Sequence, residues 1–238
     1  VLLLVFIFWN INSGSISISL NDIFQILFHK NGDETAYNIV WEIRLPRILA
    51  AVILGGALSV SGFLLQTFFG NPIAGPFVLG ISSGAKLIVA LTMIYLLGKS
   101  MVATSGLMIL AAFTGSLISM GFVLLISRKV KQMSMLVVSG IMIGYICSAI
   151  TDFVVTFADD SNIVNLHNWS LGSFSGTSWD NVSVMAVVVF AALFLTFLMS
   201  KPISAYQLGE GYAQNMGVNI KAFRIALILL SSILSACV

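Results

Sequence analysis

The chain has 238 residues, of which 58% are hydrophobic and only 8% are charged, and its mean hydropathy is +1.04. A soluble domain of this length needs far more charge on its surface, so the composition excludes a water-soluble globular protein. The net charge of +2 is too small to indicate a nucleic-acid partner. Apolar runs of roughly 20 residues, the length with which a helix crosses a bilayer core, instead predict an all-α, polytopic transmembrane helical bundle.

Seven apolar segments are candidate membrane spans, and the first and last are partial because the chain begins and ends inside apolar runs. We therefore expect a single transmembrane domain over residues 1–238, truncated at both ends. The candidate spans are 1–9, 47–69, 78–97, 102–126, 134–157, 181–200 and 223–238.

The charges of the connecting segments indicate which side of the membrane each one faces. Segments 126–133 and 201–222 are basic, whereas segments 10–43 and 158–180 are acidic. Lys and Arg concentrate in cytoplasmic loops. The basic segments are therefore predicted to face the cytoplasm together with the uncharged 70–77 loop, and this alternation places the N-terminus inside.

Two arginines, Arg44 and Arg47, bracket Pro46 at the outer end of the second span, where the positive-inside bias disfavours them. One interpretation is that their side chains snorkel along the span to the polar interface. The other is a docking site for an acidic partner, because guanidinium groups bind carboxylates in a fork geometry. Spacing alone favours snorkelling.

Small residues in the spans predict a closely packed bundle, because they let helix backbones approach one another in lipid. Gly80 and Gly84 form one GxxxG pair, and Gly140 and Gly144 form another. Segment 55–62 in the second span is rich in Gly, Ala and Ser. Close packing alone does not indicate transport.

Few ionisable side chains lie within the spans, which argues against a proton- or sodium-coupled carrier. Asp152 in the fifth span either lines an aqueous path or lies close enough to the interface to be solvated. The two histidines, His29 and His167, lie in outer loops and the chain has no H-E-x-x-H motif, which argues against an intramembrane enzyme. No catalytic residue and no metal ligand is therefore expected.

The 201–222 segment is too polar to span the membrane, and its pattern predicts two short helices broken at Gly217. Such an amphipathic pair either lies on the membrane surface or inserts its apolar face into a groove of a cytoplasmic partner. Composition does not choose between these alternatives. The apolar side chains that recur at roughly helical spacing are Tyr206, Leu208, Tyr212 and Met216.

Three stretches of the chain carry a family pattern. Residues 44–85 follow R-x-P-R-x-L-A-A, G-x-x-L-x-x-S-G-x-x-x-Q, N-P-L-A (here with Ile73) and L-G-x-x-x-G-A. Residues 208–218 read L-G-E-x-x-A-x-x-x-G-V, and residues 169–173 read W-S-L-G-S. With these motifs the chain resembles the FecCD/BtuC-type permeases, the membrane subunits of binding-protein-dependent ABC importers for iron–siderophores, haem and vitamin B12. The structural motif positions are Pro46, Gln66, Asn71, Pro72, Gly80 and Gly84.

This resemblance implies a BtuC-like fold with ten spans in a complete subunit, of which about seven are represented here. It implies a homodimer in the lipid bilayer with the pathway at the dimer axis. It also implies two cytoplasmic ATPase subunits that carry ATP and Mg, and a substrate-binding protein that docks outside. No cofactor is expected on this chain itself, and the implied location is the cytoplasmic membrane of a bacterium or archaeon.

The resemblance also implies roles for single residues. Arg44 and Arg47 become the docking residues for the binding protein, which gives their outer position a cause. Met133 and Ser134 become the cytoplasmic gate, and Asp152 lines the pathway. Segment 203–220 becomes the cytoplasmic coupling loop, with the coupling residues Leu208, Gly209, Glu210, Tyr212, Ala213, Gly217 and Val218.

Two positions depart from the family pattern. Gly70 stands where the family usually has a basic residue, and Gly75 stands where it often has an acidic one. Local contacts at the inner end of the second span are therefore in doubt, whereas the docking and coupling positions are not affected.

The expected function is import of a metal chelate driven by ATP hydrolysis on a partner subunit. Ferric siderophore is favoured over haem and cobalamin on family frequency. The alternative is an ion-coupled secondary transporter or channel, which predicts intramembrane charge pairs or broken helices lined by ionisable groups. That alternative leaves the match in the coupling loop unexplained.

Overall fold

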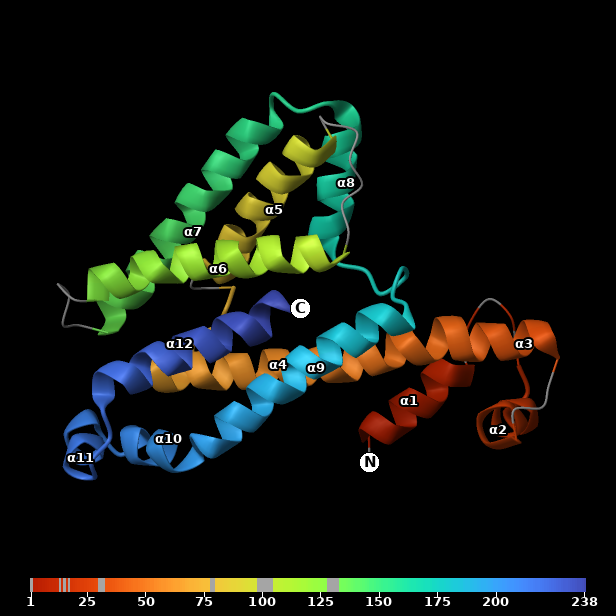
Figure 1. Cartoon of the computed structure of the whole chain (residues 1–238), viewed down its shortest axis with the longest axis horizontal. Coiled ribbons are helices and arrows are strands. Elements are labelled where there is room, and N and C mark those ends of the chain that lie inside the picture. Colours follow the sequence, from red (N-terminus) through yellow and green to blue (C-terminus); the bar gives the residue numbers. More distant parts are fainter. Residues whose placement is uncertain are drawn as a thin grey trace. The chain divides into compact units, whose positions relative to one another are not determined.

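The computed structural model describes residues 2–12, 14, 16, 18–29, 33–77, 80–97, 105–127 and 133–238, and every regular element in these ranges is helical (Figure 1). The prediction of an all-α protein is therefore confirmed. In chain order the helices are α1 (Leu2–Asn12), α2 (Leu20–His29), α3 (Glu34–Asn38), the π-helix η1 (Ile39–Arg44), α4 (Leu45–Phe69), α5 (Ile81–Leu97), α6 (Ser105–Ser127), α7 (Met133–Val155), α8 (Asp160–Leu171), α9 (Trp179–Leu198), α10 (Ser200–Gln207), α11 (Glu210–Asn215) and α12 (Ile220–Ala236).

Several of these helices correspond to the predicted spans. α5 lies at the predicted 78–97 span but is shorter than the others, and α1 and α12, with 11 and 17 residues, lie at the two partial spans. The helical stretches that are long and apolar enough to cross a membrane are Glu34–Phe69, Gly106–Ile126, Met135–Val155 and Trp179–Leu198.

The chain forms two compact units, each with its own packing. Unit 1 comprises Val1–Ile53 and Ser173–Val187, and unit 2 comprises Leu54–Gly172 and Val188–Val238. The boundaries fall inside α4 and inside α9, so each of these helices contributes to both units.

Unit 1 contains helices in a segment that the sequence predicts only as an outer loop. α2 begins with a local cap in which the Ser19 hydroxyl accepts the N–H of Asp22 at 3.2 Å and donates to its carboxylate at 2.7 Å. α3 and η1 continue without a break into α4. The π-helical turn ends at Arg44, two residues before Pro46, whose missing N–H removes one α-helical hydrogen bond.

Tryptophan side chains join the segments of unit 1. The ring of Trp41 lies 6.1 Å from the rings of both Tyr37 and Trp179, measured between centroids. The indole N–H of Trp179 donates to the carbonyl of Trp41 at 2.8 Å, which attaches the start of α9 to η1. The aliphatic core beside them consists of Ile11, Ile18, Ile23, Ile26, Val40 and Ile48.

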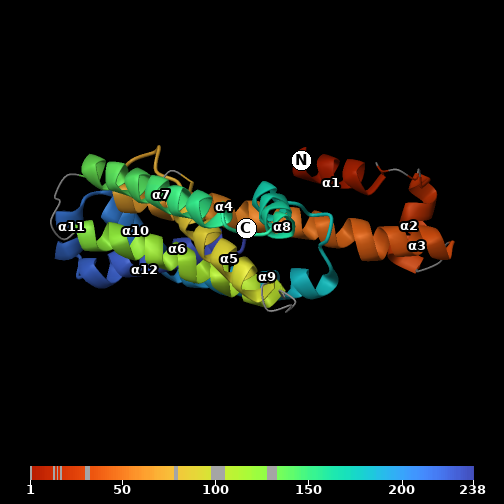
Figure 2. The ribbon, with the colours of Figure 1, turned by 90° about the horizontal axis from the view of Figure 1, so that it is seen from above.

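In unit 2, α5 packs against α6, α7 and α8, and both views show these helices together (Figures 1 and 2). Gly80 precedes α5 with φ +71°, and a Cβ atom there would lie 2.7 Å from the nitrogen of Gly144. A Cβ atom on Gly84 would lie 2.6 Å from the carbonyl oxygen of Gly115. Only glycine fits these contacts, so the close approach that the sequence predicts is present: Gly80 meets the Gly140 and Gly144 pair of α7, whereas Gly84 meets Gly115 of α6.

The small residues of α4 behave differently from this prediction. A Cβ atom on Gly55, Gly56 or Gly62 would meet no atom of the described residues within 4 Å, so the expected close packing at these glycines is wrong within this chain. α4 instead contacts α12 through hydroxyl groups. The Ser61 hydroxyl donates to the carbonyl of Ser231 at 2.9 Å, and the Ser231 hydroxyl donates to the carbonyl of Ser61 at 3.3 Å.

A compact turn ends α4. The N–H of Gly70 donates to the carbonyl of Thr67, and the N–H of Asn71 donates to that of Gln66, which is the hydrogen-bond pattern of a Schellman motif. The Asn71 side chain then accepts the N–H of Ile73 at 2.9 Å, and its carbonyl accepts the N–H of Ala74 at 3.1 Å. Asn and Pro favour such a turn because Asn bonds its own backbone two residues on and Pro presets φ.

Candidate functional site

Arg44, predicted to lie at the outer face, is 8% exposed and is bonded inside unit 1. Its guanidinium donates to the carbonyl of Ile11, in the last turn of α1, and to the carbonyl of Ile16 at 2.7 Å. A cation is favourable at the C-terminal end of a helix, where carbonyl groups lack partners. A Cβ atom on Gly14 would collide with the same guanidinium, so the side chain fills this space completely.

Arg47 is half-buried and has a different environment from Arg44. One of its terminal nitrogens donates to the exposed carbonyl of Ser175 at 2.6 Å, in the segment that leads to α9. Its Nε atom is buried, and it has no hydrogen-bond partner among the described residues. The predicted docking pair is thus unequal. Arg44 is committed to internal carbonyls, whereas Arg47 holds one exposed carbonyl and keeps part of its guanidinium accessible.

The predicted coupling loop is built from α10, α11 and the first turn of α12. The predicted helix break at Gly217 is present, because α11 ends before it and α12 begins after it. A further break at Leu208 and Gly209, which was not predicted, separates α10 from α11. The N–H of Gly217 donates to the carbonyl of Gln214 and that of Val218 to the carbonyl of Ala213, again in the Schellman pattern.

The predicted coupling residues divide into an exposed and a buried group. Leu208 and Met216 are 73% and 65% exposed, and Tyr212 is also exposed. Ala213 is fully buried beneath them. The exposed group borders a shallow groove of about 350 Å³, lined by Ser200, Lys201, Ser204, Ala205, Leu208, Tyr212 and Met216.

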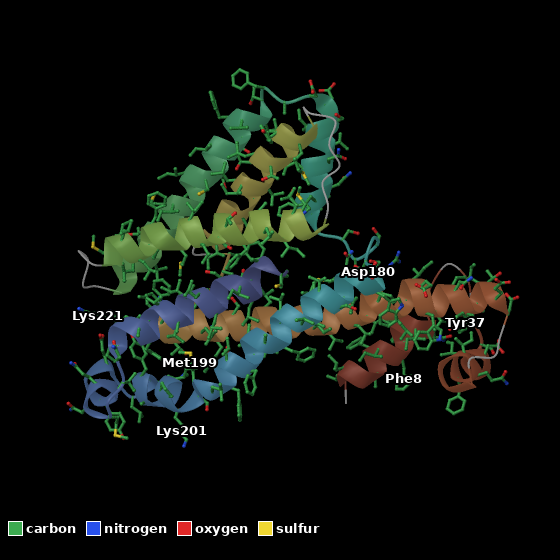
Figure 3. The ribbon with its side chains drawn as sticks, in the orientation of Figure 1. Phe8, Tyr37, Asp180, Met199, Lys201 and Lys221 are labelled. Atoms are coloured by element: carbon green, nitrogen blue, oxygen red, sulfur yellow. The ribbon has the colours of Figure 1, made fainter. Side chains whose placement is uncertain are left out.

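Two exposed lysines, Lys201 and Lys221, lie at the first turns of α10 and α12, at either end of this region (Figure 3). An apolar groove between cationic side chains suits a partner whose helix carries an apolar face with acidic neighbours. Exposed apolar side chains rimmed by polar residues are typical of protein interaction sites.

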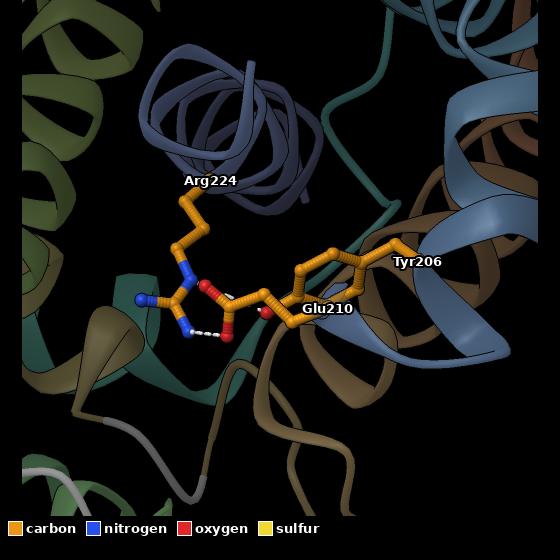
Figure 4. A network of polar contacts seen from close by, with 3 residues as sticks. All are labelled: Tyr206, Glu210 and Arg224. Atoms are coloured by element: carbon orange, nitrogen blue, oxygen red, sulfur yellow. Dashed lines mark hydrogen bonds and ion pairs between the residues drawn. The ribbon is translucent and has the colours of Figure 1, made fainter. Parts of the chain in front are cut away.

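The sequence did not indicate a structural role for Arg224, which connects α10 and α11 to α12 (Figure 4). Its guanidinium forms an ion pair of 2.8 Å with Glu210 and donates to the Tyr206 hydroxyl at 3.2 Å. It also lies 6.0 Å from the ring centroid of Phe68 in α4. Its partners are up to 18 residues away in sequence, so spacing gave no signal.

The predicted gate and pathway residues lie on α7. Met133 and Ser134 form its first turn, and their side chains lie outside the described part of the chain. Asp152 lies near the other end of α7 and is exposed. Both assignments stay predictions.

A second hollow of about 420 Å³ lies where α4 ends beside α10. It contains the side chains of the predicted motif residues Gln66, Asn71 and Pro72 together with Tyr206 and Glu210. The amide of Gln207 donates to the Thr67 hydroxyl at 3.3 Å across this junction. The motif at the end of α4 is therefore in contact with α10, in the predicted coupling loop. No group of three or more metal-binding side chains occurs in the ranges that the structure describes.

Comparisons with known proteins agree with this arrangement. Residues 2–238 match the model of the FecCD transport family. The chain is 32% identical over 235 residues to the hemin transport system permease protein HmuU of Yersinia pestis, and the match covers 98% of this chain and 69% of that protein. It is 36% identical over 191 residues to the vitamin B12 import system permease protein BtuC of Klebsiella pneumoniae, with coverage of 80% and 56%.

A solved structure described as an inward-facing metal-chelate type ABC transporter has the same fold. The TM-score is 0.82 at 24% identity, and the match covers 99% of this chain and 71% of that one. The chain thus spans between about half and three quarters of the lengths of these proteins. Because the family match extends over nearly every residue, the chain belongs to the FecCD transport family and is a multi-pass membrane protein.

Proposed function

We propose that this chain is the membrane-spanning permease of a binding-protein-dependent ABC importer that moves a metal chelate into the cytoplasm. The observation that supports this most strongly is the similarity over 235 residues to a permease named for hemin transport. The exposed apolar groove on α10 and α11 adds a local reason, because a permease without catalytic residues of its own needs a surface that receives an ATPase. ATP and Mg belong to that partner, and this chain is expected to catalyse no reaction.

The proposed orientation follows from charge. The basic segments 126–133 and 201–222 face the cytoplasm, and the acidic segments 10–43 and 158–180 face outward. The N-terminus then lies on the cytoplasmic side of the plasma membrane of a bacterium or archaeon. Two copies of the chain enclose the pathway, with Met133, Ser134 and Asp152 beside it.

The substrate is proposed as a class. Named relatives transport hemin and vitamin B12, which are both metal chelates with a large organic ligand. A ferric siderophore belongs to the same class and is the substrate that we favour. Because the binding protein selects the chelate in such an importer, its ligand identifies the substrate.

Transport is expected only when the ATPase is present. Proteoliposomes are prepared with the complete subunit, its ATPase and the binding protein. Uptake of a radiolabelled ferric siderophore, hemin or cobalamin should require ATP on the side of the membrane that carries the ATPase. Liposomes with an ATPase variant that binds but does not hydrolyse ATP serve as the control. Uptake driven by a proton or sodium gradient without ATPase would instead establish the secondary transporter.

Arg47 is the stronger of the two proposed docking residues, because its guanidinium is partly exposed and releases only one exposed carbonyl on binding a carboxylate. Replacing Arg47 with glutamate should weaken binding-protein docking and reduce its salt dependence, since like charges across an interface cost several kcal/mol. Docking is measured by surface plasmon resonance at two ionic strengths. Lys201→Glu, on the proposed cytoplasmic side, is the control, and unchanged affinity in the Arg47 variant would remove the docking role.

A further inference from the structure

α11 is a short helix that lies between two glycines with left-handed backbone. Gly209 before it has φ +128°, and Gly217 after it has φ +84°. Residues of this kind change backbone direction with little steric resistance. The orientation of α11 therefore depends on contacts beyond the chain segments at its two ends.

The described polar contact that holds α11 to a longer helix is the ion pair between Glu210 and Arg224. It joins the first residue of α11 to the second turn of α12 with a separation of 2.8 Å (Figure 4). The Arg224 and Glu210 side chains are 29% and 47% exposed, so both are partly shielded from solvent. A charge-assisted hydrogen bond in such a position fixes geometry more firmly than a fully exposed pair.

The same guanidinium also contacts α10 and α4. Its Nε donates to the hydroxyl of Tyr206, a side chain that is 8% exposed and whose ring lies 5.1 Å from that of Phe223. Its Cζ lies 6.0 Å from the centre of the Phe68 ring, within the range of a cation–π contact. Arg224 thus connects α10, α11, α12 and the end of α4 at one point.

We infer that Arg224 is a positioning residue that holds α10 and α11 in fixed orientation against α12 and α4, so that a displacement of the coupling helices reaches the membrane helices. This inference rests on the proposed function, in which an ATPase displaces these helices. A lysine is not equivalent, because only the planar guanidinium presents one nitrogen to the carboxylate while another nitrogen bonds the phenol.

The first test measures the orientation of α11 without any ATPase. Hydrogen exchange of the amides of residues 210–216 is followed in the purified complete subunit. Arg224→Ala and Glu210→Gln should each accelerate exchange in this helix, and the double variant should add little to either, because both changes remove the same contact. Lys221→Ala, an exposed cation one turn earlier on α12, is the matched control and should leave the exchange unchanged.

The second test measures coupling in the complex with ATPase and binding protein. Transport per ATP hydrolysed should fall about two- to fivefold in Arg224→Ala, the range expected for a partly exposed ion pair, while the ATPase still copurifies. Arg224→Lys should lose less transport per ATP than Arg224→Ala but should not reach the wild-type value. The double variant Arg224→Glu with Glu210→Arg, in which the two charges are exchanged, should transport more per ATP than either of its single variants.

The outcomes separate the two claims. Normal exchange in residues 210–216 of both single variants, or equal acceleration in the Lys221 control, overturns the inference. Faster exchange with unchanged transport per ATP also overturns it, because the contact then orders α11 without transmitting movement. Absence of ATP-driven uptake by the wild-type complex overturns the proposed function, whereas the exchange result still tests the role of Arg224 in holding α11. If Arg224→Ala does not fold, Arg224→Lys and Glu210→Gln give the same comparison.

Discussion

Replacing Gly115 with alanine should strongly destabilise unit 2. An added Cβ atom would collide with the carbonyl group of Gly84 and would lie 2.9 Å from the Cα of Ala85. These obstacles belong to the main chain of α5, so no side-chain rotation relieves them and the helices have to separate. Overpacking of this kind costs about 1–3 kcal/mol and occasionally more, a large share of the stability of a typical domain.

The measurement is the thermal unfolding midpoint of the purified subunit in detergent, followed by near-ultraviolet circular dichroism. Gly121→Ala is the matched control because Gly121 lies on the same helix and a Cβ atom there meets none of the described atoms within 4 Å. That change should be neutral or slightly stabilising, since alanine favours helix over glycine by about 1 kcal/mol. Equal midpoints for the two variants would contradict the contact between α5 and α6.

Replacing Arg44 with alanine should destabilise unit 1 by about 1.5–3 kcal/mol, the range for hydrogen bonds that involve a charged group. The change leaves the carbonyl groups of Ile11 and Ile16 without their donor and opens the space beside Gly14. Lysine should restore only part of the loss, because one ammonium group does not reproduce the fork that reaches both carbonyls.

Hydrogen exchange of the α1 amides reports this loosening, and binding-protein affinity is measured on the same variants. Arg44→Ala should accelerate exchange in α1, whereas Arg47→Ala, which frees only the exposed Ser175 carbonyl, should do so far less. If Arg44→Ala weakens docking while exchange in α1 is unchanged, the side chain serves the partner and not the fold. That result would also favour the original assignment of both arginines to docking.

The spans were predictable because apolar length is a local property of the sequence. The close approach at Gly80 and Gly84 was predictable for the same reason, since two small residues at helical spacing leave a flat surface on any helix. Gly55 and Gly62 in α4, seven residues apart and so also on one helix face, make no such contact in this chain. Spacing therefore indicates which surfaces allow close packing but does not indicate which neighbour occupies them.

The role of Arg44 depended on contacts that no local pattern records. Its bond to the carbonyl of Ile11 joins residues 33 positions apart, and the acceptor is a backbone group that any residue would supply. The charge bias of the loops pointed to an acidic partner for an arginine at the outer face. It did not indicate that the partners of Arg44 are carbonyl groups of the same chain. The contacts of Arg224 were not predictable for a similar reason, because Glu210 and Tyr206 become its neighbours only in the folded chain.

The break in the coupling loop shows how local signals compete. Gly209 and Gly217 both resemble helix ends, and an apolar spacing that continues from Tyr206 to Met216 favoured a helix across the first glycine. In the structure the carbonyl of Tyr206 accepts the N–H of Gly209, which closes α10 before α11 begins. Of the apolar side chains in this spacing, Tyr206 is buried, whereas Leu208, Tyr212 and Met216 are exposed and line the groove on α10 and α11.

The turn after α4 has a consequence for the synthesis of this chain. The described backbone hydrogen bonds of this turn, and the bond to the Asn71 side chain, lie between Gln66 and Ala74, so they form without a later helix. The turn is therefore able to close as soon as these nine residues have left the ribosome, before α5 has emerged from it, since local contacts form far faster than translation adds residues. We expect the second span to be delivered to the membrane with its reversal already made, which directs α5 back across the bilayer from the side where α4 ended.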